Sequence, residues 1–215
     1  DEVGFDGRYL ATQLVRGDGA RVNEYLKQIG VPYGLEVIEL ATLGRTVDLR
    51  LVGSPTGGPP VGIGDVGFGV SQLLPVLTAW AGSERRERKD RPQTLMVEQP
   101  ELHLHPAWQV ELMRLFAEPM MVWRRDGCQD DPPPRQVVLE THSEVMVRAV
   151  QQMVRSKALC PEDVSILSFD TDPAGDVPRV QRIPLTKDGE FKREWPRGFF
   201  PQSVDLRTKP YRGPG

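Results

Sequence analysis

The sequence contains little cysteine, no long apolar run and no marked excess of charge of either sign. Its two cysteines, Cys128 and Cys160, cannot build a disulfide framework, so we expect a reducing compartment, the cytoplasm. The longest apolar stretch, Leu73 to Ala81, is too short to span a bilayer, and we expect no membrane association. The net charge of −3 gives no general reason to expect nucleic-acid binding.

An initiator Met and a signal sequence are also lacking. The chain opens on Asp1 and Glu2 with no basic-then-apolar pattern after them, and we expect a segment of a longer product. Turn-forming residues, in contrast, are abundant: 21 Gly and 20 Pro make up about a fifth of the 215 residues. Together with 39% hydrophobic and 27% charged residues, they indicate a globular protein with many loops.

Alternation of polar and apolar residues predicts the strands. Leu35–Leu40 and Thr46–Val52 alternate and are expected to form a hairpin with one solvated face. Thr94–Val97 and Gln136–Leu139 are short apolar runs typical of strands buried in a parallel sheet. Because strand, loop and helix follow one another, we expect an α/β fold, a mostly parallel sheet flanked by helices, with an antiparallel hairpin segment.

Helices are expected around these strands. Ser71 and Ser143 are each placed to cap a helix, and Pro106 is placed to begin another. Shorter helices are expected at Tyr9–Leu14 and Val22–Ile29, and further strands at Val164–Phe169 and Val177–Leu185.

Polar residues gather after the two buried strands. Glu98-Gln-Pro-Glu101 follows the first, and Glu140-Thr-His-Ser143 follows the second. Carboxylates at a strand tip suit a Mg-nucleotide site, because one acid holds the ion or its waters while the next polar group positions the attacking water. An imidazole there can donate a hydrogen bond to a γ-phosphate. Taken singly, each cluster is also typical of a strand-end turn or a structural histidine.

A third cluster, Gly67-Phe-Gly-Val-Ser71-Gln72, precedes both. Its two glycines let the backbone approach an anion, and Ser71 is expected to open a helix whose first N–H groups favour phosphate. The plainer alternative is a glycine-containing turn with an ordinary N-cap.

In this order, the three clusters resemble the C-terminal half of an ABC-type ATPase. The sequence is similar to predicted AAA-family ATPases of bacteria with RecF, SMC and OLD-nuclease affinities, many of them in defence and repair operons. The resemblance runs from about Val61 to Ser143 and depends most on the string from Glu98 to Pro106. The tail from Asp188 onward also resembles the ending of one bacterial subgroup.

The resemblance implies catalytic roles. Glu98 would end the Walker B strand and lie near Mg²⁺. Gln99 and Glu101 would handle the water, and His142 would be the switch histidine that senses the γ-phosphate. An amide at Gln99, where the family normally has Glu, can orient a water but cannot take its proton, so we expect slow hydrolysis or Glu101 as a substitute base.

The resemblance also implies nucleotide contacts across a homodimer. Gly67, Gly69, Ser71 and Gln72 would form the signature motif, which caps the nucleotide bound by the opposite subunit. His105 would belong to the D-loop, which crosses to the partner.

The phosphate-binding motif G-x-x-x-x-G-K-[ST] is missing from all 215 residues. The nearest candidate, Gly53–Gly58, has no Lys and runs into two prolines. We therefore expect a Walker A half on the same or a separate chain. In this interpretation residues 1–60 are a helical and hairpin segment, 61–187 the ATPase core and 188–215 the C-terminal tail.

The predicted function is an ATPase that binds and slowly hydrolyses Mg-ATP in a dimer to control a partner effector or a DNA-directed activity, in antiphage defence or DNA repair. Hydrolysis is expected only with the Walker A half. A non-hydrolysing, ATP-gated regulatory module is an open alternative. A metal-dependent hydrolase or nuclease is another, built on His103 and His105 with Glu98, Glu101 and His142, or on Asp170-Thr-Asp172. The charged run Arg85–Arg91 is typical of a solvated loop, with DNA contact as its alternative.

Overall fold

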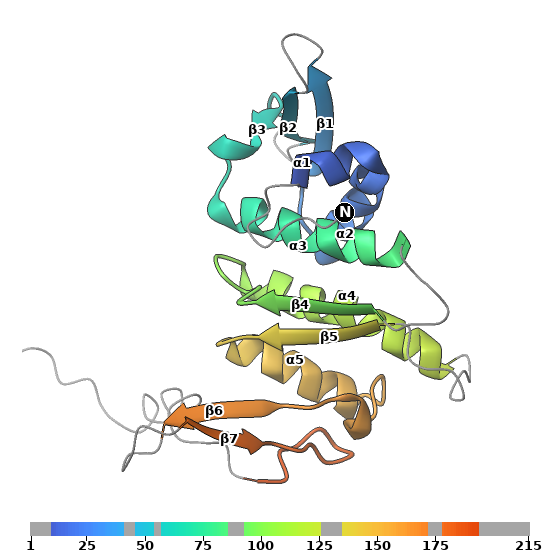
Figure 1. The fold of residues 1–215 in the computed structure, drawn as a ribbon, viewed down its shortest axis with the longest axis vertical. Helices are drawn as coiled ribbons and strands as arrows, with labels where there is room; N and C mark the ends of the chain where they lie inside the picture. The colour runs from blue at the N-terminus through green and yellow to red at the C-terminus, as the bar shows by residue number, and fades with distance from the viewer. Residues whose placement is uncertain are drawn as a thin grey trace, which may run out of the picture. The chain divides into compact units, whose positions relative to one another are not determined.

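The computed structural model describes residues 10–40, 46–53, 57–85, 93–125, 135–171 and 178–193. These fall into two compact units, divided between Thr141 and His142 (Figure 1). Several predicted features lie outside the described residues: most of the charged run (86–91), the middle of the Gly53–Gly58 loop, Cys128, Asp172 and the tail from 194 onward.

The first unit begins with helices and an antiparallel sheet. Helix α1 (Leu10–Gln13) passes through a π-helical turn (Leu14–Asp18) into α2 (Gly19–Ile29), so the two expected short helices are joined. Strand β1 (Gly34–Leu40) pairs antiparallel with β2 (Thr46–Val52), which confirms the predicted hairpin. A short third strand, β3 (Val61–Gly62), pairs with β2 and was not expected.

The parallel sheet of the first unit is formed by β4 (Gln93–Glu98) and β5 (Arg135–Glu140), where the apolar runs predicted it. Helix α4 (Pro106–Arg125) begins at the predicted proline and runs behind the two strands in Figure 1. With the helices and the antiparallel hairpins, this sheet confirms the α/β fold class. Among the described strands, however, antiparallel pairs are more numerous than the expected mostly parallel sheet implies.

Helix α3 (Phe68–Arg85) starts four residues earlier than a cap at Ser71 would imply, because the first helical residue would then be Gln72. The prediction that Ser71 caps this helix is wrong, because Ser71 lies inside the first turn, where its hydroxyl donates to the Phe68 carbonyl at 2.9 Å. A serine inside a helix can bond to a preceding carbonyl in this way, so the same residue type fits both positions.

The core of the first unit lies among α2, α3 and α4. Trp80 of α3 is 1% exposed and stands edge-on to Phe116 of α4, with ring centroids 5.2 Å apart. The Arg135 guanidinium, at the start of β5, lies 4.6 Å from the Trp80 ring centroid. Trp80 thus connects α3, the helix that begins in the Gly67–Gln72 cluster, to the parallel sheet. Other almost fully buried side chains are Tyr25, Leu26, Leu73, Leu74, Leu77, Leu112 and Leu115.

The second unit contains α5 (Glu144–Arg155), a short 3₁₀ helix (Pro161–Asp163) and the antiparallel hairpin β6 (Leu167–Thr171) and β7 (Pro178–Arg182). Ser143 caps α5 as predicted, since its hydroxyl accepts the Met146 N–H at 3.2 Å. Gln151 of α5 donates to the Gly189 carbonyl at 2.8 Å, and a Cβ on Gly189 would stand 2.2 Å from the Gln151 carbonyl oxygen. Glycine is therefore required where this turn meets the helix.

Candidate functional site

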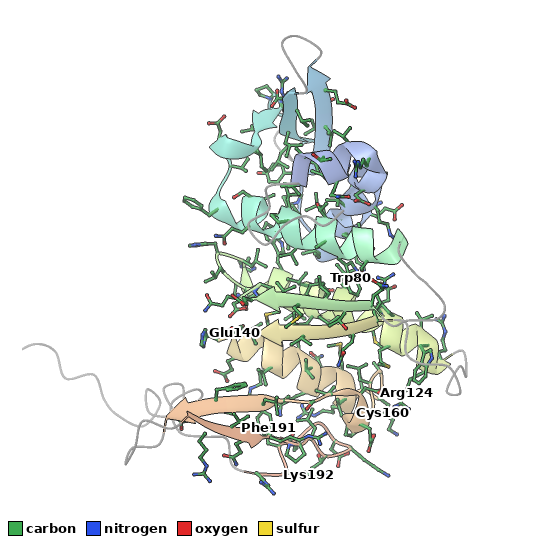
Figure 2. The ribbon with its side chains drawn as sticks, in the orientation of Figure 1. Trp80, Arg124, Glu140, Cys160, Phe191 and Lys192 are labelled. Carbon is green, nitrogen blue, oxygen red and sulfur yellow. The ribbon has the colours of Figure 1, made fainter. Side chains whose placement is uncertain are left out.

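Two glutamates end the parallel strands at the same level. Glu98 of β4 is paired in register with Glu140 of β5, whose side chain is labelled in Figure 2. Both are exposed, and alternation places them on one face of the sheet. Neighbouring strands lie roughly 5 Å apart, so the two carboxylates can serve one ligand. Glu140 was predicted only as a member of a strand-end cluster, with no role of its own, although its position at the end of β5 matches that of Glu98 at the end of β4.

Gln99 is held between the two strands. Its N–H donates to the Glu140 carbonyl at 2.8 Å, which extends the ladder one residue beyond β4. Its φ of 47° lies in the left-handed region, which is uncommon for a residue with a side chain. The chain then turns sharply, with Leu102 N–H donating to the Gln99 carbonyl at 3.2 Å. The residue at the position of the expected catalytic base is therefore fixed by both strands.

Glu101 is less accessible than the two strand-end glutamates. Its side chain is only partly exposed, and the Oε2 atom is shielded from solvent. The Leu104 N–H donates to the Glu101 carbonyl at 3.0 Å within the same turn. A substitute base must reach a water molecule, and Glu98 and Glu140 offer more open oxygens than Glu101.

The two histidines of the turn have separate surroundings. His103, with φ of 58°, places its ring 5.6 Å from the ring of Phe68 at the start of α3. His105 accepts the Ala107 N–H at Nδ1, 3.2 Å away, and so satisfies a free backbone donor at the start of α4. The imidazole of His105 is otherwise exposed. Helix capping is a role for His105 that the sequence analysis missed.

Gly69 explains why α3 and the turn after β4 lie so close together. A Cβ at Gly69 would stand 2.5 Å from the His103 carbonyl oxygen, closer than real Cβ atoms approach. Gly67 has no such neighbour, and both Gly67 and Gln72 are exposed. The structure therefore brings the Gly67–Gln72 segment into contact with the turn that contains Glu101, His103 and His105.

His142 belongs to the second unit, where it directly precedes the Ser143 cap and is exposed. Within the described ranges, no three His, Cys, Asp or Glu side chains are grouped so that they could hold a metal ion. Mg²⁺ bound with a nucleotide usually takes only one or two carboxylates, with phosphates and waters as its other ligands. The oxygen atoms of Glu98 and Glu140 fit that requirement.

The family of the chain follows from a match to the AAA ATPase domain family over residues 21–147. This span is more than half of the chain and includes the Gly67–Gln72 segment, both strand tips and His142. The protein belongs to this family of ATPase domains. A comparison with curated proteins found no match.

Solved structures with a similar fold are heads of SMC ATPases. One, from work on the ATP-driven dimerization and DNA-stimulated activation of SMC ATPases, has a TM-score of 0.56 and 11% identity over 94% of this chain and 97% of that chain. An Smc head bound to the C-winged helix domain of ScpA has a TM-score of 0.54 and 12% identity, over 82% of this chain and 45% of that one. An Smc head with coiled coil and joint from Pyrococcus yayanosii has a TM-score of 0.53 and 11% identity, over 95% and 31%.

The fold is thus that of the ABC-type ATPase head, as the motif order predicted. The chain spans nearly all of the first structure but less than half of the other two. Among the helices that the structure describes, none combines the length and apolar character needed to cross a membrane.

Proposed function

We propose that the chain binds and slowly hydrolyses Mg-ATP in a homodimer, together with a Walker A half supplied from outside these 215 residues. The observation that carries the proposal is the in-register pair Glu98 and Glu140, with Gln99 fixed between the strands, in a chain of the AAA ATPase domain family. Paired oxygen ligands at the carboxyl ends of parallel strands are placed where ligands bind in open α/β sheets.

The strand-end residues and His142 have separate roles at the bound nucleotide. Glu98 holds Mg²⁺ or its waters, and the ion neutralises charge on the nucleotide phosphates when it is bound. Gln99 orients the attacking water through its amide but takes no proton. Glu101 is the proposed substitute base, and its shielded oxygen is a physical reason for slow turnover. His142 donates a hydrogen bond to the γ-phosphate.

The dimer brings further residues to the nucleotide. The segment at the start of α3, with Gly67, Gly69, Ser71 and Gln72, caps the nucleotide held by the opposite subunit, and the first N–H groups of the helix favour an anion. Of these four residues, Gly67 and Gln72 are exposed, and Gly69 is buried. His105, on the adjoining turn, approaches the partner. The close approach of Gly69 to the His103 carbonyl packs these two segments together, so the proposed nucleotide cap adjoins the turn after β4.

The dimer would act on a partner effector or on DNA, in bacterial defence or repair. The similar SMC structures support this part of the proposal, because one is described with ATP-driven dimerization and DNA-stimulated activation and another is bound to a domain of ScpA.

The first test uses the purified 215-residue chain with Mg-ATP. We expect no measurable phosphate release and only weak ATP binding, since no described or predicted loop supplies the Lys that reaches the β- and γ-phosphates. Adding the Walker A half, on the same or a second chain, should restore tight binding and a slow turnover. Turnover by the chain alone would refute the requirement for a second half.

A non-hydrolysing, ATP-gated module is the second candidate, and Gln99 is the observation that favours it. Gln99→Glu in the complete protein separates the two. A carboxylate restores a general base, which contributes about 10²-fold or more to turnover. A gain of this size shows that the natural protein is a nucleotide-gated switch. No change shows that an existing carboxylate already takes the proton and that the protein is a working ATPase.

A further inference from the structure

Three arginines surround a hollow of about 390 Å³ on the β6–β7 hairpin. β7 contributes Arg179 and Arg182, and Arg193 comes from the chain that returns beside it. Two interactions hold this returning segment in place. Leu185 and Phe191 form a β-bridge, and the Lys192 N–H donates to the Pro184 carbonyl at 2.9 Å; Phe191 and Lys192 are labelled in Figure 2. The hollow is lined by Arg179, Val180, Gln181, Arg182, Pro184 and Arg193.

These guanidinium groups form no ion pair with a carboxylate in the described part of the chain, and all three are exposed. Two other exposed arginines of the same unit differ, because Arg148 pairs with Glu144 and Arg155 with Glu190. Asp170, which is paired with Arg179 across the hairpin, is the one carboxylate of the described strands β6 and β7, so the three arginines leave a net positive charge. A net positive charge around a concave surface raises the local potential and attracts an anion. Guanidinium groups match phosphate oxygens especially well, since they donate two parallel hydrogen bonds.

An exposed apolar surface adjoins the arginines. Phe169 is 71% exposed and pairs directly with Val180, which is 54% exposed and lines the hollow. Leu167, two residues before Phe169, is 51% exposed and pairs with Arg182. Alternation places these four side chains on one face of the hairpin, with the Phe169 ring beside Val180 at the rim of the hollow. Arg179 is on the other face and borders the hollow from that side.

We propose that this hairpin binds single-stranded nucleic acid, with a base stacked on Phe169 and backbone phosphates held by Arg179, Arg182 and Arg193. An open aromatic ring on a strand face beside a basic groove is the arrangement that single strands use, because every base offers a flat π-face and every linkage a negative charge. A duplex keeps its base faces stacked inside, whereas a single strand offers a flat ring and a negative charge at every nucleotide. The inference specifies the nucleic-acid partner of the proposed function but does not depend on the ATP site.

The test measures binding of the 215-residue chain, without ATP, to a fluorescein-labelled oligothymidylate of about 20 nucleotides by fluorescence anisotropy. Three phosphate contacts predict a slope of log K against log[salt] of about −2, at roughly 0.7 per contact on single strands. We expect a duplex of the same length to bind at least about fivefold more weakly, since stacking on the ring is then lost.

Variants separate the two contributions. Arg179→Gln, Arg182→Gln and Arg193→Gln should each reduce the magnitude of the salt slope by about 0.7. Phe169→Ala should weaken binding at least about fivefold and leave the slope unchanged, whereas Phe169→Trp should keep the affinity and add fluorescence that the bound oligonucleotide quenches. Arg148→Gln is the matched control for the loss of one positive charge in the same unit and should change neither quantity.

Three results would overturn the proposal. The first is that labelled oligothymidylate does not bind at low salt, and the second is that the arginine and phenylalanine variants bind it as tightly as the natural chain does. The third is that polyglutamate displaces it as effectively as unlabelled oligothymidylate does. The last result would identify a surface for an acidic protein. Circular dichroism confirms that each variant is folded, and because all four substituted side chains are exposed we expect no loss of structure. An inactive ATP site would not affect any of these measurements.

Discussion

The β4–β5 sheet and the β6–β7 hairpin are both two-stranded, and both expose apolar side chains. In the first, Met96 and Val138 are 74% and 43% exposed, and the row that they share ends in Glu98 and Glu140. In the second, the exposed row around Phe169 is bordered by arginines. Similar exposure with opposite charge fits the different partners that we propose for them: a cation with its nucleotide at one, and a polyanion at the other.

The two surfaces also differ in their support. The glutamates are positioned by a buried core through Trp80 and by the tight turn after β4, whereas the arginines lie on a hairpin whose side chains are largely exposed. A metal-nucleotide site needs fixed geometry, because the ion accepts few ligand positions. A single strand bound by stacking and charge tolerates variation, so an exposed hairpin suffices.

The largest expected effect is a loss of stability in the buried core that positions Glu98 and Glu140. Trp80→Ala removes a buried ring that contacts Phe116 and lies beneath Arg135, and should reduce the free energy of unfolding of the first unit by about 3–5 kcal/mol. Urea denaturation measures this loss. Trp80→Phe keeps a ring there and should cost clearly less. Amide exchange in β6 and β7 should not change, and equal loss of protection in both regions would contradict the difference in support.

Glu98→Gln tests the charge at the acidic surface. In the chain supplied with its Walker A half, we expect the Mg²⁺ concentration required for ATP binding to rise about 10- to 100-fold, because an oxygen ligand or its hydrogen bond to a metal-bound water is weakened. Titration with Mg²⁺ measures the shift. Glu118→Gln, an exposed glutamate of α4, is the control and should have no effect. Both variants should bind oligothymidylate as the natural chain does, because the arginines of the β6–β7 hairpin are not changed.

Gly69→Ala tests the contact between α3 and the turn after β4. The added Cβ would clash with the His103 carbonyl, and we expect a loss of about 1–3 kcal/mol in the free energy of unfolding. Gly67→Ala is the matched control, since nothing lies within 4 Å of its added Cβ. Thermal denaturation of the two variants gives the comparison. Equal stabilities would show that the close approach at Gly69 is not required.

The smallest effect has the opposite sign. Like charges directly opposite on neighbouring strands destabilise a sheet, so Glu140→Gln should stabilise the first unit by about 0.2–1 kcal/mol. Glu118→Gln again serves as the control in urea denaturation. The same substitution should weaken Mg-ATP binding in the complete protein, as expected where a functional site is kept at a cost in stability. A destabilised Glu140→Gln variant would show that the two carboxylates do not repel each other.

Much of the fold could be predicted because local patterns agreed with it. The apolar runs at β4 and β5, the proline at the start of α4 and the Ser143 cap each act through neighbouring residues. Ser71 was misplaced because serine satisfies helical geometry both as a cap and within the first turn. The short strand β3 was missed because two residues are too few for a pattern.

The candidate site was predicted in its composition but not in its arrangement. Strand-end clusters identified Glu98, Gln99, Glu101 and His142, and the resemblance assigned their roles. The pairing of Glu98 with Glu140, the shielding of Glu101 and the capping by His105 depend on strand register and turn geometry, which link residues far apart in the chain. These particular roles remain predictions for the experiments above.

The sequence by itself determined the ATPase family, the order of its motifs and the α/β class, because each depends on residue type and local spacing. Tertiary structure alone decided why position 69 is glycine, which carboxylates face each other and where the three arginines of the hollow gather. The physical reason is that steric contact and Coulomb interaction depend on distance in space, and packing sets that distance between residues that the sequence separates by tens of positions.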